Sequence, residues 1–397
     1  MTKKIIVSFL SGFTILVITW VYQNYDFSLT VEDGFFKKVI KLKSKFIKPV
    51  PRKNASIIFI NTGKDLALVD DTTDYGQVAI SDRTKIYQLL KLINNEAKKP
   101  LFTVLDIQFY YPYTQNLKID SLLKIEIARN KELLIPLVKD ADGNYKNPLF
   151  PSLYAYSDYQ TFGSSFNKFR ILNHSPVSSI PIVLHEKLNQ AVYKDHLFYA
   201  TCNGKLCLSA IWPEYYLKDK DVRDATKPSY TQYYNVGELL LLASVDSASI
   251  STLFDKKIIM IGNFEMDSHV TPLGKIAGPV LLSNVYLSLL NNQHIINVGF
   301  LITLLLAFSS LSYTAWFSKI PIVKLPFKFI FSSYLQKFVK SYISYFGSMF
   351  LLSLICVFLF DTQVALFLPS LILSGIEYIR QKKYLTEKKT EEATKAA

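Results

Sequence analysis

Long apolar segments dominate the pattern of hydrophobic and polar positions along this chain. Four of them are predicted to span a membrane, and they cover residues 5–23, 297–317, 341–360 and 364–379. A helix needs about 20 predominantly apolar residues to cross the hydrocarbon core of a bilayer. The fourth segment is the shortest and contains Pro369 and Glu377; because Glu377 lies near its end, an interfacial position is expected for this carboxylate. The pattern therefore predicts four transmembrane helices.

Strand and helix patterns alternate between the first two apolar segments. The short apolar runs ASIIFINTG, LFTVLDIQF and KELLIPLV predict strands. The segments between them, DRTKIYQLLKLINNEAKK and IDSLLKIEIARN, carry apolar residues at helical spacing. Such alternation implies parallel strands joined by right-handed crossovers. We therefore expect residues 25–296 to form one extracytoplasmic α/β domain with a mostly parallel sheet.

Other segments of this domain and of the tail give weaker patterns. DGFFKKVIKLKSKFIK alternates lysine with apolar residues and predicts an amphipathic helix near the membrane or against the domain. PEYYLKDKDVRDATKPSYTQYYN is aromatic and charged, which favours a loop. DKKIIMIGNF predicts a further strand, and GPVLLSNVYLSLLNN predicts a helix leading to the second span. The final TEKKTEEATKAA is too polar to bury a core and is expected to be disordered.

Basic residues gather beside the apolar segments and indicate the orientation of the chain. The start of the chain (1–24, with the first span), the loop 318–340 and the tail 380–397 are rich in lysine, and four spans place all three on one side. Basic loops favour the cytoplasmic side. Lys3 and Lys4 also precede the first span as in a signal peptide, but no clear small-x-small cleavage site follows, which favours an uncleaved anchor. We expect a multi-pass protein of the bacterial inner membrane with residues 25–296 outside the cytoplasm.

The net charge of +13 raises the question of a nucleic-acid partner. Much of this excess is lysine close to the membrane, where it attracts anionic lipid headgroups. The sequence shows neither arginine interleaved with aromatic residues nor a known nucleic-acid-binding motif. The membrane is therefore an expected partner and nucleic acid is not.

Two of the three cysteines lie close together, in YATCNGKLCLSA. If Cys202 and Cys207 flank a four-residue loop, they face each other and a disulfide can form. If Asn203-Gly204 is a two-residue turn, Cys202 opposes Lys205 and the cysteines are diagonal, too far apart for easy closure. Both alternatives stay open. No second Cys or His pair stands at ligand spacing, so neither zinc nor another cofactor is expected.

Polar residues follow three of the predicted strands, where open α/β sheets bind their ligands. One group lies in NTGKDLALVDDTTDYGQVAISDR after the first strand, and Asp106 ends the strand FTVLD. The third group, after KIIMIG, contains Asn263, Glu265, Asp267 and His269. Asp106, Asp267 and His269 are expected to converge, and such a set can hold a metal or move a proton. The same residue types also cap helices and satisfy loop amides.

The five residues Asp106, Asn263, Glu265, Asp267 and His269 are therefore ligand-binding or switch candidates, with no catalytic residue and no metal ligand assigned. The sequence lacks a phosphate-binding loop, a His-Glu-x-x-His motif and a Gly-x-Ser-x-Gly motif. We therefore do not expect an enzyme.

Several motifs resemble the second type of CHASE domain, a cyclase/histidine-kinase-associated sensory extracellular domain. They are Arg83 opening RTKIYQLLKLINN, Asp106 in LFTVLDIQF, Asp120 in DSLLKIEIARNKELLIPL, and the segment 253–291. That last segment is the most specific, with Gly262, Asp267, Thr271, Pro272, Leu273, Gly274 and Gly278. The resemblance covers nearly the whole chain. It implies one span, a sensor domain and three further spans that precede a cytoplasmic output domain.

The chain departs from this family after Arg380, where fewer than twenty residues follow. No output domain fits there, so only the sensor half of the family's function is carried over. We expect a sensor-like protein whose extracytoplasmic domain detects a ligand or partner and signals through its membrane helices to a separate protein.

Two alternatives to a sensor stay open. The first is a structural or assembly subunit of a cell-envelope complex, since an aromatic segment around Tyr215, Tyr216, Tyr230, Tyr233 and Tyr234 suits a protein interface. The second is a periplasmic enzyme or metal-binding protein. Homo-oligomer formation is also left open, because the pattern of residues does not decide it.

Overall fold

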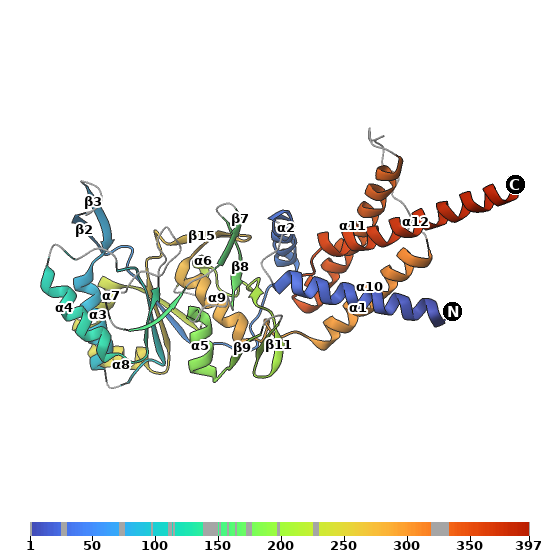
Figure 1. Ribbon diagram of the computed structural model, residues 1–397. Helices are drawn as coiled ribbons and strands as arrows, with labels where there is room; N and C mark the ends of the chain where they lie inside the picture. The colour runs from blue at the N-terminus through green and yellow to red at the C-terminus, as the bar shows by residue number, and fades with distance from the viewer. Residues whose placement is uncertain are drawn as a thin grey trace. The chain divides into compact units, whose positions relative to one another are not determined.

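The computed structural model describes residues 2–24, 30–70, 76–96, 98–109, 113, 116–137, 150, 152–156, 159–162, 165–171, 177–196, 199–224, 230–318 and 333–396. The chain divides into two compact units (Figure 1). Residues Ile47–Asp195 and Ala200–His294 form what we call the sheet unit. Met1–Phe46, His196–Tyr199 and Ile295–Ala397 form the helical unit.

A parallel sheet lies at the centre of the sheet unit. Its six described strands run in the order β13 (Thr231–Asn235), β1 (Ile57–Asn61), β14 (Ile258–Gly262), β4 (Phe102–Asp106), β5 (Leu133–Leu137) and β6 (Leu153–Tyr156). Every neighbouring pair is parallel. β1 and β14 are buried at every position, as expected for strands covered on both faces. The predicted α/β fold with a mostly parallel sheet is confirmed.

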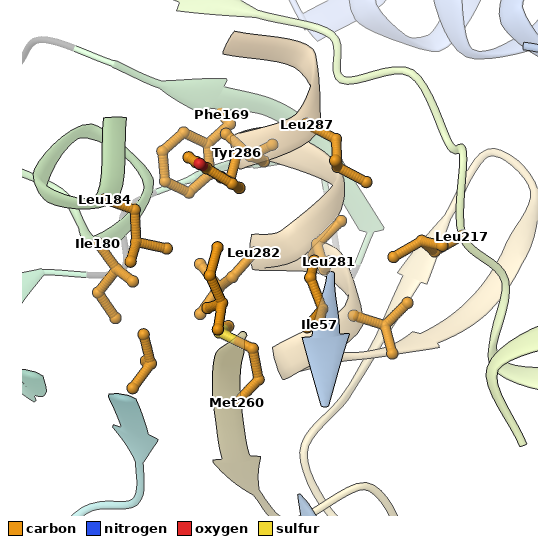
Figure 2. Close-up of a cluster of buried hydrophobic side chains, with 14 of the residues drawn as sticks. Ile57, Phe169, Ile180, Leu184, Leu217, Met260, Leu281, Leu282, Tyr286 and Leu287 are labelled. Atoms are coloured by element: carbon orange, nitrogen blue, oxygen red, sulfur yellow. The ribbon is translucent and has the colours of Figure 1, made fainter. Parts of the chain in front are cut away.

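Helices cover both faces of this sheet (Figure 1). One face carries α3 (Arg83–Asn95), α4 (Leu117–Arg129), α7 (Val236–Val245) and α8 (Ser247–Phe254). The other face carries α5 (Ile180–Asn189) and α9 (Gly278–Leu290). Figure 2 shows the cluster on this second face, where Met260 of β14 lies beside Leu282 of α9. All thirteen residues of α9 are buried, which makes it the central helix of this layer.

Shorter strands complete the sheet unit. β2 (Leu66–Asp70) pairs with β3 (Gln77–Ser81), and β9 (Tyr193–Asp195), β10 (Ala200–Cys202) and β11 (Lys205–Cys207) form a small antiparallel sheet. A further sheet contains β12 (Ala210–Ile211), β8 (Ser165–Arg170), β15 (Ser268–Thr271) and β16 (Gly274–Ala277), with β7 (Tyr159–Phe162) paired to β8. The short helix α6 (Asp219–Val222) lies between β12 and β13 in the chain.

The predicted loop over residues 213–235 is wrong in two places, because Asp219–Val222 forms the short helix α6 and Thr231–Asn235 forms the edge strand β13. Threonine and tyrosine favour strands, and this preference prevails over the charged residues that precede them. The strand is anchored to β1 through a ladder that begins where Ile57 N donates to Tyr230 O at 3.0 Å.

Within the described residues, three helices of the helical unit are long and apolar enough to cross a membrane. They are α1 (Thr2–Asn24), α10 (Val298–Phe317) and α11 (Ser333–Phe360). α1 and α10 pack closely, because a Cβ on Gly12 would lie 2.6 Å from Ser309 N. Trp316 Nε1 also donates to Ser11 Oγ at 3.0 Å. Small residues permit this close approach of two helices within a bilayer.

The predicted amphipathic helix forms as α2 (Thr30–Phe46). The predicted fourth span lies in α12 (Phe367–Ala396), which is not one of the three apolar helices just named. The prediction of a disordered tail is wrong, because residues 386–396 continue this helix. Lys383 and Glu387 lie 3.9 Å apart on one face, and such pairs support a polar helix.

Glu377 lies on α12 and is only 1 % exposed, because its side chain packs against α11. Ser341 Oγ donates to its carboxylate at 2.6 Å, and Arg380 Nη2 lies 3.2 Å away. The carboxylate is therefore paired within the helical unit.

Candidate functional site

Four neighbouring strands end in a row of polar residues and one glycine. The register places Asn235 of β13 beside Asn61 of β1, Asn61 beside Gly262 of β14, and Gly262 beside Asp106 of β4. These are carboxyl ends of parallel strands, where ligands of open α/β sheets bind. We call this row, together with the loop 263–269, the sheet-edge site.

Asn61 is the buried centre of the sheet-edge site. Its Nδ2 donates to Asn235 Oδ1 at 3.1 Å, and its Oδ1 accepts from Gly63 N at 2.8 Å and from Phe264 N at 3.0 Å. The side chain is fully buried and joins three chain segments. Asn61 therefore fixes the start of both the loop after β1 and the loop after β14.

Two of the five predicted site residues shape the loop itself. Asn263 Oδ1 accepts from Glu265 N at 3.0 Å and from Met266 N at 2.9 Å, which closes a side-chain-bridged turn. Glu265 Oε1 lies 2.8 Å from Arg223 Nη1. Both contacts hold the loop in place.

Arg223 and Asn61 were not among the five predicted site residues, although Asn61 opens the first of the three predicted polar groups. Arg223 Nη2 donates to Phe264 O at 3.1 Å, and its guanidinium lies 5.5 Å from the centre of the Tyr233 ring. Its segment was expected to be a loop. The sequence of that segment does not indicate that Arg223 contacts Phe264 and Glu265, about forty positions later. Arg223 therefore holds the loop 263–269 against the edge strand β13.

Asp106, Asp267 and His269 are brought together, as the order of strands predicts. His269 Nε2 lies 3.0 Å from Asp267 Oδ1. Burial and, to a smaller extent, the nearby Asp267 carboxylate raise the pKa of Asp106 to about 7, and His269 opposes this rise. A carboxyl group with a pKa near neutrality gains or loses its proton when the charges beside it change. This trio is the part of the site that can respond to a cation, a proton or a charged ligand.

Asp267 connects the trio to the beginning of α9. Gly278 N donates to Asp267 O at 2.8 Å, and a Cβ on Gly278 would lie 1.9 Å from Asp267 Oδ2. A Cβ on Gly262 would lie 2.6 Å from Pro279 Cγ. Both glycines are therefore required for close packing of the loop on the helix. A carboxylate at a helix N-terminus is stabilised by the helix dipole.

The remaining residues of the 262–278 motif form a hairpin turn between β15 and β16. Thr271 Oγ1 donates to Gly274 O at 2.7 Å and accepts from Leu273 N at 3.2 Å. Gly274 has φ of +115°, a conformation that residues with a side chain rarely adopt. These residues position the hairpin and do not contribute to the charged trio.

Arg83 and Asp120, also part of the motif set, form an ion pair between α3 and α4. Arg83 Nη1 lies 2.6 Å from Asp120 Oδ1, and Tyr113 N donates to Asp120 Oδ2 at 3.0 Å. Arg83 is only 2 % exposed and also stacks on Phe109. This buried pair holds the two helices together.

The cysteine hairpin adopts the two-residue turn. Cys202 opposes Lys205, and Ala200 opposes Cys207. Both cysteines are buried free thiols, so the predicted possibility of a disulfide between them is not realised. A diagonal pair across a two-residue turn lacks the geometry for easy closure.

Comparisons with protein-family models, with curated proteins and with solved structures find no match to this chain. Its function is therefore argued from the residues and geometry described above.

Proposed function

We propose that this chain is a membrane-anchored sensor, with the sheet unit as an extracytoplasmic domain of the second CHASE type. The observation that carries the proposal is the connection made by Asp267. This residue contacts His269 and the first residue of α9, and its charge affects Asp106. Along the chain α9 is followed directly by α10, one of the apolar helices.

The proposed signal begins with a change of charge at the sheet-edge site. A bound cationic group or a proton would alter the repulsion between Asp106 and Asp267. Because Asp267 packs against Gly278, the loop and the start of α9 would then move together. A ligand shifts such an equilibrium only by binding one of the two arrangements more tightly. The role proposed for the sheet-edge site is therefore conformational and non-catalytic.

The membrane arrangement completes the proposal. The apolar helices, with the predicted fourth span in α12, cross a bacterial inner membrane, and the basic tail faces the cytoplasm. A separate protein partner receives the signal there. The basic residues near the ends of the predicted spans support this orientation.

The experiment that tests the function uses the tagged full-length chain, isolated from its native membranes in mild detergent. Mass spectrometry identifies the proteins that accompany it. We expect a kinase, a cyclase or a response regulator, present in a fixed ratio. The output of that partner is then measured with wild-type chain and with the double variant Asp267→Ala/His269→Ala.

The double variant should lose the signal while its abundance and its thermal unfolding midpoint stay close to wild type. Asp70→Ala is the matched control, because Asp70 is an exposed aspartate on the edge of β2. Normal output from the double variant would contradict the proposed switch. A fixed association with a large envelope assembly would favour a structural subunit instead.

A further inference from the structure

A group of histidine and cysteine side chains lies in the sheet unit, on α5, on β10 and in the segment after α9. His185, Cys202 and His294 place one potential ligand atom each within 4.8 Å of one another. Their exposed fractions are 6 %, 3 % and 0 %. The three residues are distant in sequence, and only the fold brings them together. None belongs to the sheet-edge site.

Tyr193 lies among these side chains. Its hydroxyl is 2.7 Å from His185 Nδ1 and 3.2 Å from His294 Nε2, and it is hydrogen-bonded to the Cys202 thiol. The rings of His185 and His294 are perpendicular, with centres 5.6 Å apart. The contacts show that the polar atoms of all three residues converge on one small region.

One buried nitrogen in this region has no partner. His294 Nδ1 makes no hydrogen bond with any described residue, although the side chain is fully buried. An unpaired buried polar atom destabilises the folded state, so folded proteins usually avoid it. A metal ligand commonly uses one imidazole nitrogen for the ion while the other is hydrogen-bonded. The Tyr193 hydroxyl supplies that second hydrogen bond at Nε2.

Cys207 adds a second thiol next to this region. The register of β10 and β11 places Cys202 and Cys207 diagonally on the same buried face of the hairpin. Four residues separate them in the sequence, and zinc-binding cysteine pairs are typically two to four residues apart. The same geometry that hinders a disulfide therefore suits two ligands of one ion.

We propose that His185, Cys202, Cys207 and His294 form a closed, four-ligand site for a divalent ion of the zinc class. We call these residues the His–Cys cluster. Zinc prefers this combination of imidazole and thiolate ligands in a tetrahedral arrangement. Ligand atoms around one zinc ion lie about 3.5 Å apart. Side-chain movements of about 1 Å would therefore bring the ligand atoms of His185, Cys202 and His294, which lie within 4.8 Å of one another, into range.

Charge balance supports a divalent ion in so buried a place. Binding forms two metal–sulfur bonds and releases the two thiol protons to solvent. The ion and two thiolates then have no net charge, and the two imidazoles bind as neutral donors. A neutral site avoids the large cost of a buried unpaired charge. Full burial leaves no open position for substrate, so the role of the ion is structural.

The ion would tie the β9–β11 sheet to α5 and to the chain segment between α9 and α10. Figure 1 shows α5 beside α9, and the ring contacts of Tyr193 with His185 and His294 connect β9 to α5 and to the segment after α9. It would thus fix the end of α9 opposite to the end that Asp267 contacts.

The test begins with the full-length wild-type chain in detergent, with a non-thiol reductant and no chelator. Elemental analysis should find about one zinc per chain. After removal of zinc, Co²⁺ should bind at one equivalent and give the intense absorption of thiolate-to-cobalt charge transfer, together with visible bands of tetrahedral cobalt. This spectrum requires no variant to fold.

Variants then locate the ion. Cys202→Ser and His294→Asn should lower the bound zinc at least tenfold, and Cys207→Ser should reduce the charge-transfer intensity. Cys356→Ser is the matched thiol control, and His269→Ala is the histidine control from the sheet-edge site. Both controls should retain about one zinc per chain.

Three results would overturn the proposal. Absence of a thiolate-to-cobalt band in the wild-type chain would exclude cysteine ligands. Zinc that is lost in His269→Ala and kept in Cys202→Ser would place the ion at the sheet edge. Zinc that stays at similar levels in every variant and is removed by dialysis would be an adventitious ion only.

Discussion

The sheet-edge site and the His–Cys cluster lie in the same unit and are built in opposite ways. The sheet-edge site presents partly exposed charged residues, Glu265, Asp267 and His269, in the chain that follows a strand of the parallel sheet. The His–Cys cluster consists of buried residues with neutral side chains, taken from the helix α5, the β10–β11 hairpin and the turn that follows α9. The first suits exchange with solvent or a ligand, and the second suits permanent retention of an ion.

Burial changes pKa values in both regions, upward for the carboxyl group and downward for the imidazoles. It raises the pKa of Asp106 to about 7 and lowers the pKa of His185 to about 4 and of His294 to about 3. Both changes favour the neutral form. Asp106 is consequently close to its titration point at neutral pH, while the two imidazoles are far from theirs. Of these two regions, the sheet edge is therefore the one whose protonation responds to small changes of nearby charge.

The largest expected effect tests whether the sheet edge depends on its buried centre. Replacing Asn61 by Ala leaves the buried amide of Phe264 and the partly buried amide of Gly63 without their acceptor. The cost should be about 3 kcal/mol, because each unsatisfied buried group costs about 1–3 kcal/mol. Thermal unfolding of the full chain in detergent should show a clearly lower midpoint for the sheet unit.

The matched comparison for Asn61→Ala is Asn263→Ala, which removes a more exposed turn and should cost about 1 kcal/mol. If both variants unfold at the wild-type temperature, Asn61 does not organise the two loops.

The next effect concerns the packing of the loop on α9. Gly278→Ala places a methyl group where Asp267 Oδ2 lies, so the loop must move. Overpacking of this kind costs about 1–3 kcal/mol. Gly76→Ala is the control, because a Cβ there meets no atom within 4 Å and should be neutral or slightly stabilising. Equal unfolding midpoints for the two variants would contradict the close packing.

The sheet-edge site and the His–Cys cluster also differ in how far the sequence alone predicts them. Apolar runs and helical spacing were sufficient for the α/β alternation, and strand ends were sufficient to group Asp106, Asp267 and His269. Arg223 was missed because β13 follows a charged segment that resembles a loop. The His–Cys cluster was missed because the two histidines are far apart in sequence. The spacing of Cys202 and Cys207 was its one local signal.

The third prediction concerns how the stability of the sheet-edge site depends on pH. The pKa of Asp106 is higher in the folded chain than the ordinary value of 3.8, so its contribution to stability is present below that value and is lost as pH rises towards 7. The loss should be on the order of 2 kcal/mol, less than the whole shift implies because the residue is only partly buried.

Asp106→Asn removes this titration and should flatten the dependence of the unfolding midpoint on pH between 4 and 8. The variant should be more stable than wild type at pH 8. An unchanged pH dependence would mean that Asp106 is an ordinary solvated carboxylate.

The smallest expected effect is at the rim of the sheet edge. Arg223→Ala breaks the pair with Glu265, whose two side chains are 33 % and 41 % exposed. Exposed pairs contribute about 0.2–1 kcal/mol, and salt weakens them. The midpoint should fall by a few degrees at low salt and by less at high salt. A loss that is large and independent of salt would show that Arg223 supports the loop mainly through its packing on Tyr233.

The central claim is that charge at Asp267 controls the beginning of α9, and hydrogen–deuterium exchange tests it most directly. Wild-type chain and Asp267→Asn are compared in the same detergent, with Asp70→Asn as control. We expect exchange of the loop 263–274 and of the first turns of α9 to rise about two- to fivefold in Asp267→Asn, as a loss of 0.5–1 kcal/mol at a helix N-terminus implies. Asp70→Asn should match wild type. Unchanged exchange in α9 would contradict the account, because the sheet edge would then have no path to the helix that precedes the membrane segment.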